Sequence, residues 1–101
     1  MAKRPRKKAP SCWVYVLASA RGANLRTYVG WSTDPQARLQ RHNAGRGAKS
    51  TRGRFWTLIH LERSASRRAA MSREWHLKRD RDFRRTLRER FRERIAIGAP
   101  G

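Results

Sequence analysis

The stretch RTYVGWSTDPQARLQRHNAG, residues 26–45, has the pattern of a β-strand that runs straight into a helix. Residues 25–31 are mostly β-branched, aromatic or aliphatic, which is typical of a strand. A helix is expected to begin directly after this strand. Ser32 or Thr33 can cap it, Asp34 lies near the positive N-terminal end of the helix dipole, and Pro35 suits the first turn. Asn43 to Gly45 then favour its end.

The segments before and after this stretch complete a small sheet. Residues 12–19, CWVYVLAS, form a continuous apolar run and predict a strand buried on both faces. Only a short segment with Gly22 and Asn24 separates it from the strand at 25–31, so the two strands should form an antiparallel hairpin. Residues 55–62, FWTLIHLE, predict a third strand.

A second helix is expected after the third strand, opened by Ser64 or Ser66, and the helical pattern continues from Asp80. The sequence therefore predicts an α+β fold: a small three-stranded antiparallel sheet flanked by helices, in the order β-β-α-β-α plus a C-terminal helix. We expect a basic flexible tail over 1–10, the main domain over 11–80, and a basic C-terminal helix and tail over 81–101. Its apolar stripe, Phe83, Leu87 and Phe91, should pack on the body or on a partner.

The charge of the chain selects a class of partner. The 101 residues include 26 Lys and Arg against 7 Asp and Glu, a formal net charge of +19. Such a surface attracts polyanions, and nucleic acid is the commonest of these. No stretch has a clean lipid-facing side, so we expect no membrane binding. The single cysteine, Cys12, allows no disulfide within the chain, which fits a cytoplasmic protein, with association with the nucleoid as a further option.

Two tyrosines on the predicted hairpin are candidates for chemistry. Tyr15 and Tyr28 lie on neighbouring strands, but the hairpin register that would put them on one face is open. Ordinary packing with the hydroxyls at the rim is the alternative. Gly30 follows Tyr28 within a strand, where glycine often marks a close approach to the backbone.

Three side chains on the predicted helices are further candidates. Arg38 and His42 are four residues apart and share one helical face, which is either a functional face or merely a solvated one. Glu74 lies mid-helix among Ala70, Met71 and Leu77, which we expect to form the face packed on the sheet. A partly buried carboxylate needs a metal ion or a cation as partner, and a salt bridge to Arg73 or Lys78 is the structural alternative.

The segment GRGAKSTRGR, residues 45–54, is expected to be a loop. Glycines and cations together suit contacts with phosphate groups, and a solvated loop is the alternative. The cations concerned are Arg46, Lys49, Arg52 and Arg54.

Taken in order, these residues resemble the GIY-YIG nuclease superfamily. WVY at 13–15 stands for its first motif and YVG at 28–30 for its second, with Arg38 and Glu74 following on the two later helices. The resemblance covers residues 12 to about 80. The stretches HNAGRGAKSTRG and SREWHLKR are similar to a small bacterial single-domain subgroup of uncharacterised proteins.

The resemblance implies a divalent-metal-dependent endonuclease that hydrolyses phosphodiester bonds in DNA, with low sequence specificity and a possible selectivity for DNA structures in repair or recombination. One ion, Mg²⁺ or Mn²⁺, would be held by Glu74, since hard oxygen ligands suit these metals. DNA is favoured over RNA as the partner, no small-molecule substrate is expected, and the oligomeric state is open.

The resemblance also implies roles for the other candidates. Tyr28 would be the general base or would orient the attacking water, with Tyr15 beside it, and Arg38 would hold the scissile phosphate. His42 occupies a hydrogen-bonding or proton-relaying position, and Lys49 would contact phosphate. Two departures stand out: Trp13 replaces the glycine of the first motif, and Trp31 stands where some relatives carry a lysine.

Two other kinds of function remain open from the sequence. One is a basic DNA- or RNA-binding module that keeps the fold without catalysis, and the other is a basic protein that docks on acidic partners. Glu74 discriminates between them and a nuclease, because a carboxylate near phosphates is useful only where a cation lies between the two.

Overall fold

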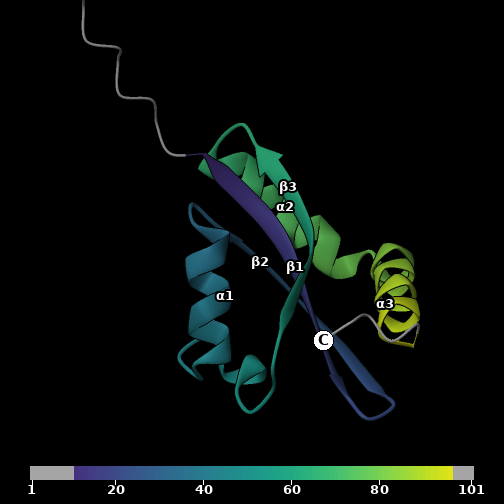
Figure 1. Ribbon diagram of the computed structural model, residues 1–101. Coiled ribbons are helices and arrows are strands. Elements are labelled where there is room, and N and C mark those ends of the chain that lie inside the picture. The colour runs from purple at the N-terminus through teal and green to yellow at the C-terminus, as the bar shows by residue number, and fades with distance from the viewer. Residues whose placement is uncertain (1–10, 97–101) are drawn as a thin grey trace, which may run out of the picture.

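The computed structural model describes residues 11–96 and shows a three-stranded antiparallel sheet with helices packed on both faces (Figure 1). The predicted tail over 1–10 and the last residues, 97–101, lie outside the described part. The elements are β1 (Cys12–Arg21), β2 (Asn24–Ser32), α1 (Pro35–Asn43), the short 3₁₀ turn η1 (Lys49–Thr51), β3 (Thr57–Ser64), α2 (Arg67–Arg79) and α3 (Arg81–Ala96). The predicted fold class is therefore confirmed.

Strand β1 is the centre of the molecule. The strand order is β2-β1-β3, and β1 pairs antiparallel with both neighbours. Val14, Val16 and Leu17 are completely buried, as expected for a continuous apolar strand covered on both faces. Because β1 is central, everything that projects from it lies inside one of two cores.

The register of the hairpin decides where the tyrosines point. Tyr15 lies opposite Gly30, and Leu17 lies opposite Tyr28. Since side chains alternate along a strand and directly opposed residues share a face, Tyr15 and Tyr28 project to the same side of the sheet. The face shared by the two tyrosines, left open by the sequence, follows from this pairing.

Each face of the sheet carries its own core. Val14, Val16 and Val29 pack with Ala70 and Leu77 of α2 and with Leu87 of α3. On the other face, Tyr15, Leu17 and Trp56 pack with Tyr28, Leu58 and Leu39 of α1. The tyrosines therefore belong to the α1 side, whereas α2 covers the opposite side and reaches the site only past the edge of the sheet.

The helix ends differ from the expected ones in two places. Asp34, not Ser32 or Thr33, caps α1 by accepting from the backbone N–H of Ala37, while the hydroxyl of Ser32 accepts from the N–H of Asp34. Ser66 caps α2 as expected. The chain does not continue straight from α2 into α3, because Asp80 ends the first helix and accepts from the N–H of Phe83 at the start of the second.

An ion-pair network fixes α2 against β3. Arg73 donates two hydrogen bonds to Glu62, over 2.7 and 2.9 Å, and His60 lies 2.6 Å from the same carboxylate. The hydrogen bonds from Arg73 are the main reason that the pKa of Glu62 falls to about 2. Arg73 is therefore engaged with Glu62 rather than with Glu74.

The predicted stripe on the C-terminal helix packs on the body. Leu87 and Phe91 are buried, and Phe83 packs against the core shared with α2. One side of α3 carries four arginines that line a hollow of about 310 Å³, namely Arg81, Arg84, Arg85 and Arg88. Within residues 11–96 no helix is long and apolar enough to cross a membrane.

Candidate active site

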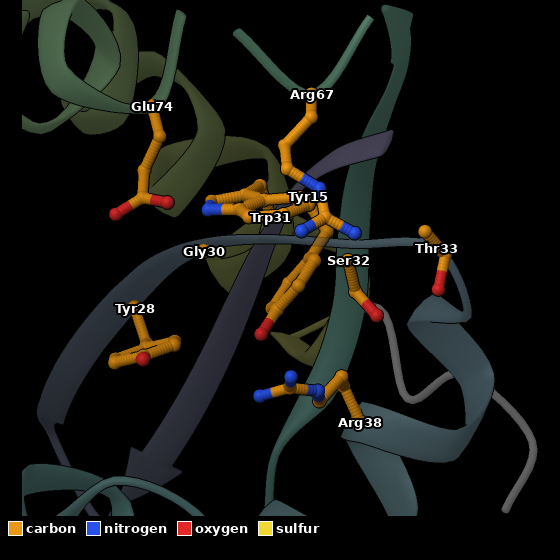
Figure 2. A pocket seen from close by; sticks show the side chains of 9 residues that line it. All are labelled: Tyr15, Tyr28, Gly30, Trp31, Ser32, Thr33, Arg38, Arg67 and Glu74. Carbon is orange, nitrogen blue, oxygen red and sulfur yellow. The ribbon is translucent and has the colours of Figure 1, made fainter. Parts of the chain in front are cut away.

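A cleft of about 410 Å³ lies at the edge of the sheet formed by β2, between α1 and α2. Five of the candidate residues identified in the sequence line this cleft, and Figure 2 shows how they lie. They are Tyr15, Tyr28, Gly30, Arg38 and Glu74, and the remaining lining residues are Trp31, Ser32, Thr33 and Arg67.

Strand β2 passes through the middle of this cleft. In Figure 2, Glu74 lies on one side of the strand, and Tyr28 and Arg38 lie on the other. Gly30 is the residue of β2 between them. A Cβ atom at this position would lie 2.5 Å from the hydroxyl oxygen of Tyr15, so only glycine leaves room for that hydroxyl. The close approach predicted for Gly30 is therefore made by Tyr15.

A buried chain of hydrogen bonds runs from Tyr15 into the loop after α1. Thr51 donates its hydroxyl proton to the carbonyl of Ala48 over 2.7 Å, and its oxygen lies 2.8 Å from Nδ1 of His42. Because that proton is already used, Nδ1 of His42 must be the donor to Thr51. Nε2 is then the acceptor of the neutral ring, and Tyr15 donates its O–H to it over 3.3 Å.

The environment keeps both members of this pair neutral. Burial, helped by Tyr28, raises the pKa of Tyr15 to about 12 against the opposing effect of Arg38. Burial also lowers the pKa of His42, and the positive charges of Arg38 and Arg41 lower it further. At neutral pH the pair is a protonated phenol bonded to a neutral imidazole, which is a proton donor facing a proton acceptor.

Tyr28 completes the aromatic cluster from the rim. Its ring centroid lies 4.7 Å from that of His42 and 6.4 Å from those of Tyr15 and Trp56. It lines both the main cleft and a neighbouring hollow of about 270 Å³. Tyr28 therefore covers the buried imidazole and presents its own hydroxyl to whatever enters the cleft.

The family of the chain follows from comparison with known proteins. The model of the GIY-YIG catalytic domain matches residues 11–88. The chain belongs to the GIY-YIG family. This is a family of nucleases, which generally use divalent metal ions. No solved structure matches the chain.

Curated relatives place it among small GIY-YIG proteins. It is 48% identical over 63 residues to a UPF0213 protein of Streptococcus sanguinis, covering 61% of this chain and 69% of the relative. It is 47% identical over 66 residues to one of Halobacterium salinarum, covering 64% and 82%. A third, of Lacticaseibacillus paracasei, is 38% identical over 76 residues, covering 74% and 82%. These names state no activity.

The carboxylate of Glu74 lies where a cation can reach it. Its side chain is 20% exposed, faces the cleft, and pairs with Lys78 over 2.8 Å. Within residues 11–96 no three His, Cys, Asp or Glu side chains converge as a metal cage. A single carboxylate at an open cleft nevertheless suits Mg²⁺ or Mn²⁺, which keep several waters and bind substrate phosphate oxygens. A metal ion bound at Oε1 of Glu74 would displace the Lys78 ammonium, which pairs with that oxygen.

The cations predicted in the GIY-YIG loop fall into two groups. Arg46 lines the hollow beside Tyr28, and Lys49 and Arg52 are exposed around η1, so all three are accessible to a phosphate backbone. Arg54 instead donates to the hydroxyl and carbonyl of Ser19 and to the carbonyl of Asn24. These bonds fasten the loop to the β1–β2 hairpin, which is a structural role, and the contact of Arg54 with phosphate stays a prediction.

The GIY-YIG site also contains two residues that the sequence reasoning missed. Arg67, at the start of α2, lines the cleft with its guanidinium 5.5 Å from the ring centre of Trp31. It brings a cation next to Trp31, the position where some relatives carry a lysine. Thr51 is completely buried and orients His42. A threonine in a glycine-rich basic loop carries no local signal for either burial or a histidine partner.

Replacing Thr51 with valine should slow catalysis while leaving substrate affinity almost unchanged. Valine removes the acceptor for the Nδ1 proton, which frees the imidazole to adopt the tautomer that cannot accept from Tyr15. We expect kcat to fall by about 10- to 100-fold. Steady-state kinetics over a pH series measure this, and the acid limb should move to lower pH because an imidazolium without its acceptor is less stable.

The matched control is Thr51→Ser, which keeps both hydrogen bonds and should retain most of the rate. If valine and serine variants behave alike, or if only KM changes, Thr51 has no part in orienting His42.

Proposed function

We propose that this GIY-YIG protein is a divalent-metal-dependent endonuclease that hydrolyses phosphodiester bonds in DNA with low sequence specificity. The observation that carries the proposal is the cleft in which a proton acceptor, an arginine and an accessible carboxylate face one another across Gly30. DNA rather than RNA, Mg²⁺ or Mn²⁺ as the ion, a cytoplasmic location and a task in repair or recombination are parts of the proposal.

Activation of water is assigned to the Tyr15–His42 pair. Tyr15 lines the cleft, and its hydroxyl, which directs its proton at Nε2 of His42, can still accept a hydrogen bond on its oxygen. As water attacks phosphorus, its proton passes to the Tyr15 oxygen while the Tyr15 proton passes to His42. No phenolate is required, which matters because burial raises the pKa of Tyr15 to about 12. Of the two roles that the resemblance implies for Tyr28, general base or orientation of the attacking water, this proposal keeps the second and assigns the first to the Tyr15–His42 pair.

Stabilisation of the transition state is assigned to the cations. Arg38 reaches the cleft from α1 and Arg67 from α2, so a phosphate held between them would be neutralised from two directions. A divalent ion bound by Glu74 would add charge neutralisation and favour departure of the leaving oxygen. Both arginines project from helices, α1 and α2, whose backbones fix the directions from which the side chains approach the cleft.

Binding of the rest of the nucleic acid is assigned to the basic surface. The arginine hollow on α3 and the cations around η1 offer contacts for backbone phosphates, and these carry no sequence information. A domain with so few exposed groups to read base edges should bind by charge. Its affinity should therefore fall steeply with salt concentration.

The decisive test is cleavage of fluorescently labelled linear, nicked and branched DNA by the purified protein in Mg²⁺, in Mn²⁺ and in EDTA. We expect cleavage in at least one metal and none in EDTA. Binding to the same DNA without cleavage under every metal condition would support the alternative of a non-catalytic binding module.

A further inference from the structure

A second hollow of about 250 Å³ adjoins the cleft on the α2 side. Its lining residues are Trp31, Met71, Glu74, Trp75, Lys78 and Arg79. Trp31 and Glu74 also line the main cleft, so the two hollows are adjacent. A polymer whose phosphate lies in the cleft can therefore extend into this hollow.

Two large apolar side chains of α2 are exposed here. Trp75 is 53% exposed and Met71 is 54% exposed, whereas Ala70 and Leu77 on the neighbouring face of α2 are completely buried. Met71, expected on the packed face, therefore points outward. An exposed tryptophan and methionine beside a polar cleft indicate a binding surface rather than a packing surface.

A cation covers one face of the exposed indole. The guanidinium of Arg79 lies 3.7 Å from the ring centre of Trp75 and donates to the carbonyl of Trp75 over 2.9 Å. Lys78 lines the same hollow and forms an ion pair with Glu74. A nucleobase can stack on the face of the indole that Arg79 leaves open, while its phosphate meets Lys78 or Arg79, which line the same hollow.

We propose that this surface, formed by Trp31, Met71 and Trp75 and here termed the Trp75 shelf, binds an unpaired nucleobase next to the scissile phosphate. In an intact duplex both faces of a base are covered by its neighbours, so only an unpaired nucleotide can stack on the shelf. The substrate class is therefore nucleic acid with unpaired nucleotides at the cut, such as a flap, a gap or a single-stranded end. The location beside a scissile phosphate rests on the proposed function.

The test measures stacking without cleavage. Metal-free protein in EDTA is titrated into oligonucleotides that carry 2-aminopurine at successive positions of an unpaired segment, and into fully paired duplexes of equal length. We expect a change in 2-aminopurine fluorescence at one or two adjacent positions. Trp75→Ala should abolish this change and weaken binding of the unpaired oligonucleotide by roughly ten-fold, leaving duplex binding within about two-fold.

Two further variants serve as controls. Trp75→Phe keeps an aromatic face and should retain most of the fluorescence change. Phe55→Ala removes another exposed aromatic side chain, 75% exposed and outside both hollows, and should have no effect.

An unchanged 2-aminopurine signal with wild-type protein, or an equal loss of affinity for unpaired and paired DNA in Trp75→Ala, would overturn the proposal. Because the assay contains no metal, the outcome does not depend on whether the protein cleaves DNA. Intact stacking without cleavage in the metal assay would remove the proposed nuclease function alone.

Discussion

Glu74→Gln should abolish metal-dependent cleavage while nucleic-acid binding is retained or tightened. The change keeps the shape of the side chain but removes the charge that would hold a divalent ion, and Mg²⁺ binds poorly to a neutral amide in place of a carboxylate. Loss of a metal's stabilisation, several kcal/mol, corresponds to a decrease in kcat of about a thousand-fold. Single-turnover cleavage rates and DNA affinities of the two proteins provide the comparison.

The affinity measurement separates this role from simple loss of structure. Removing a negative charge near phosphates should leave binding unchanged or improve it, which an unfolded variant would not do. Glu89→Gln is the matched control, because it removes the same charge from an exposed position on α3. A Glu74→Gln protein that cleaves within ten-fold of the wild-type rate would rule out the metal-binding role.

Arg38→Ala should lower kcat by about 100- to 1,000-fold and weaken binding far less. Arg38 faces the cleft beside the Tyr15 hydroxyl, where extra charge develops on the phosphate during attack. Removal of one preorganised donor to such charge typically costs this much in rate. Arg38→Lys should recover only part of it, because an ammonium group cannot form the two-pronged contact with phosphate.

Arg41→Ala is the control variant for Arg38→Ala, because both should shift the acid limb of the pH–rate profile in the same direction. Both arginines lower the pKa of His42, so removing either should raise that pKa. Since activity requires the neutral imidazole, the acid limb of the rate profile should move to higher pH in both variants. Only Arg38→Ala should also lower the plateau, and an unchanged plateau in this variant would contradict the proposed contact with phosphate.

The order of the strands and helices and most of the residues of the cleft could be predicted from the sequence, because short local patterns indicate both. A continuous apolar run made β1 central, a proline and an aspartate marked the start of α1, and Gly30 within a strand indicated a close approach. Once these patterns fix the order and pairing of the elements, residues that are distant in sequence are brought together by the fold. Tyr15, Arg38 and Glu74 line one cleft as their predicted roles require.

What could not be predicted depends on register and on distant partners. The pairing of Tyr15 with Gly30 follows from the geometry of the hairpin turn, and a shift of one residue would turn Tyr28 to the opposite face. The bond of Arg73 to Glu62 joins a helix to a strand, with nothing in either segment to indicate it. Met71 was placed on the packed face because its spacing permits it, but β2 and α3 leave that position uncovered.

The buried course of the hydrogen bonds from Tyr15 through His42 to Thr51 has an evolutionary consequence. Tyr15 and His42 fill space in the interior, so truncating either side chain would destabilise the fold whether or not the protein cleaves DNA, whereas Thr51→Val nearly preserves the buried volume. Glu74 and Arg38 are accessible, and their replacement leaves the interior intact. A lineage could therefore lose its chemistry by one accessible substitution and persist as a stable nucleic-acid-binding protein, with the tyrosine and histidine preserved as relics.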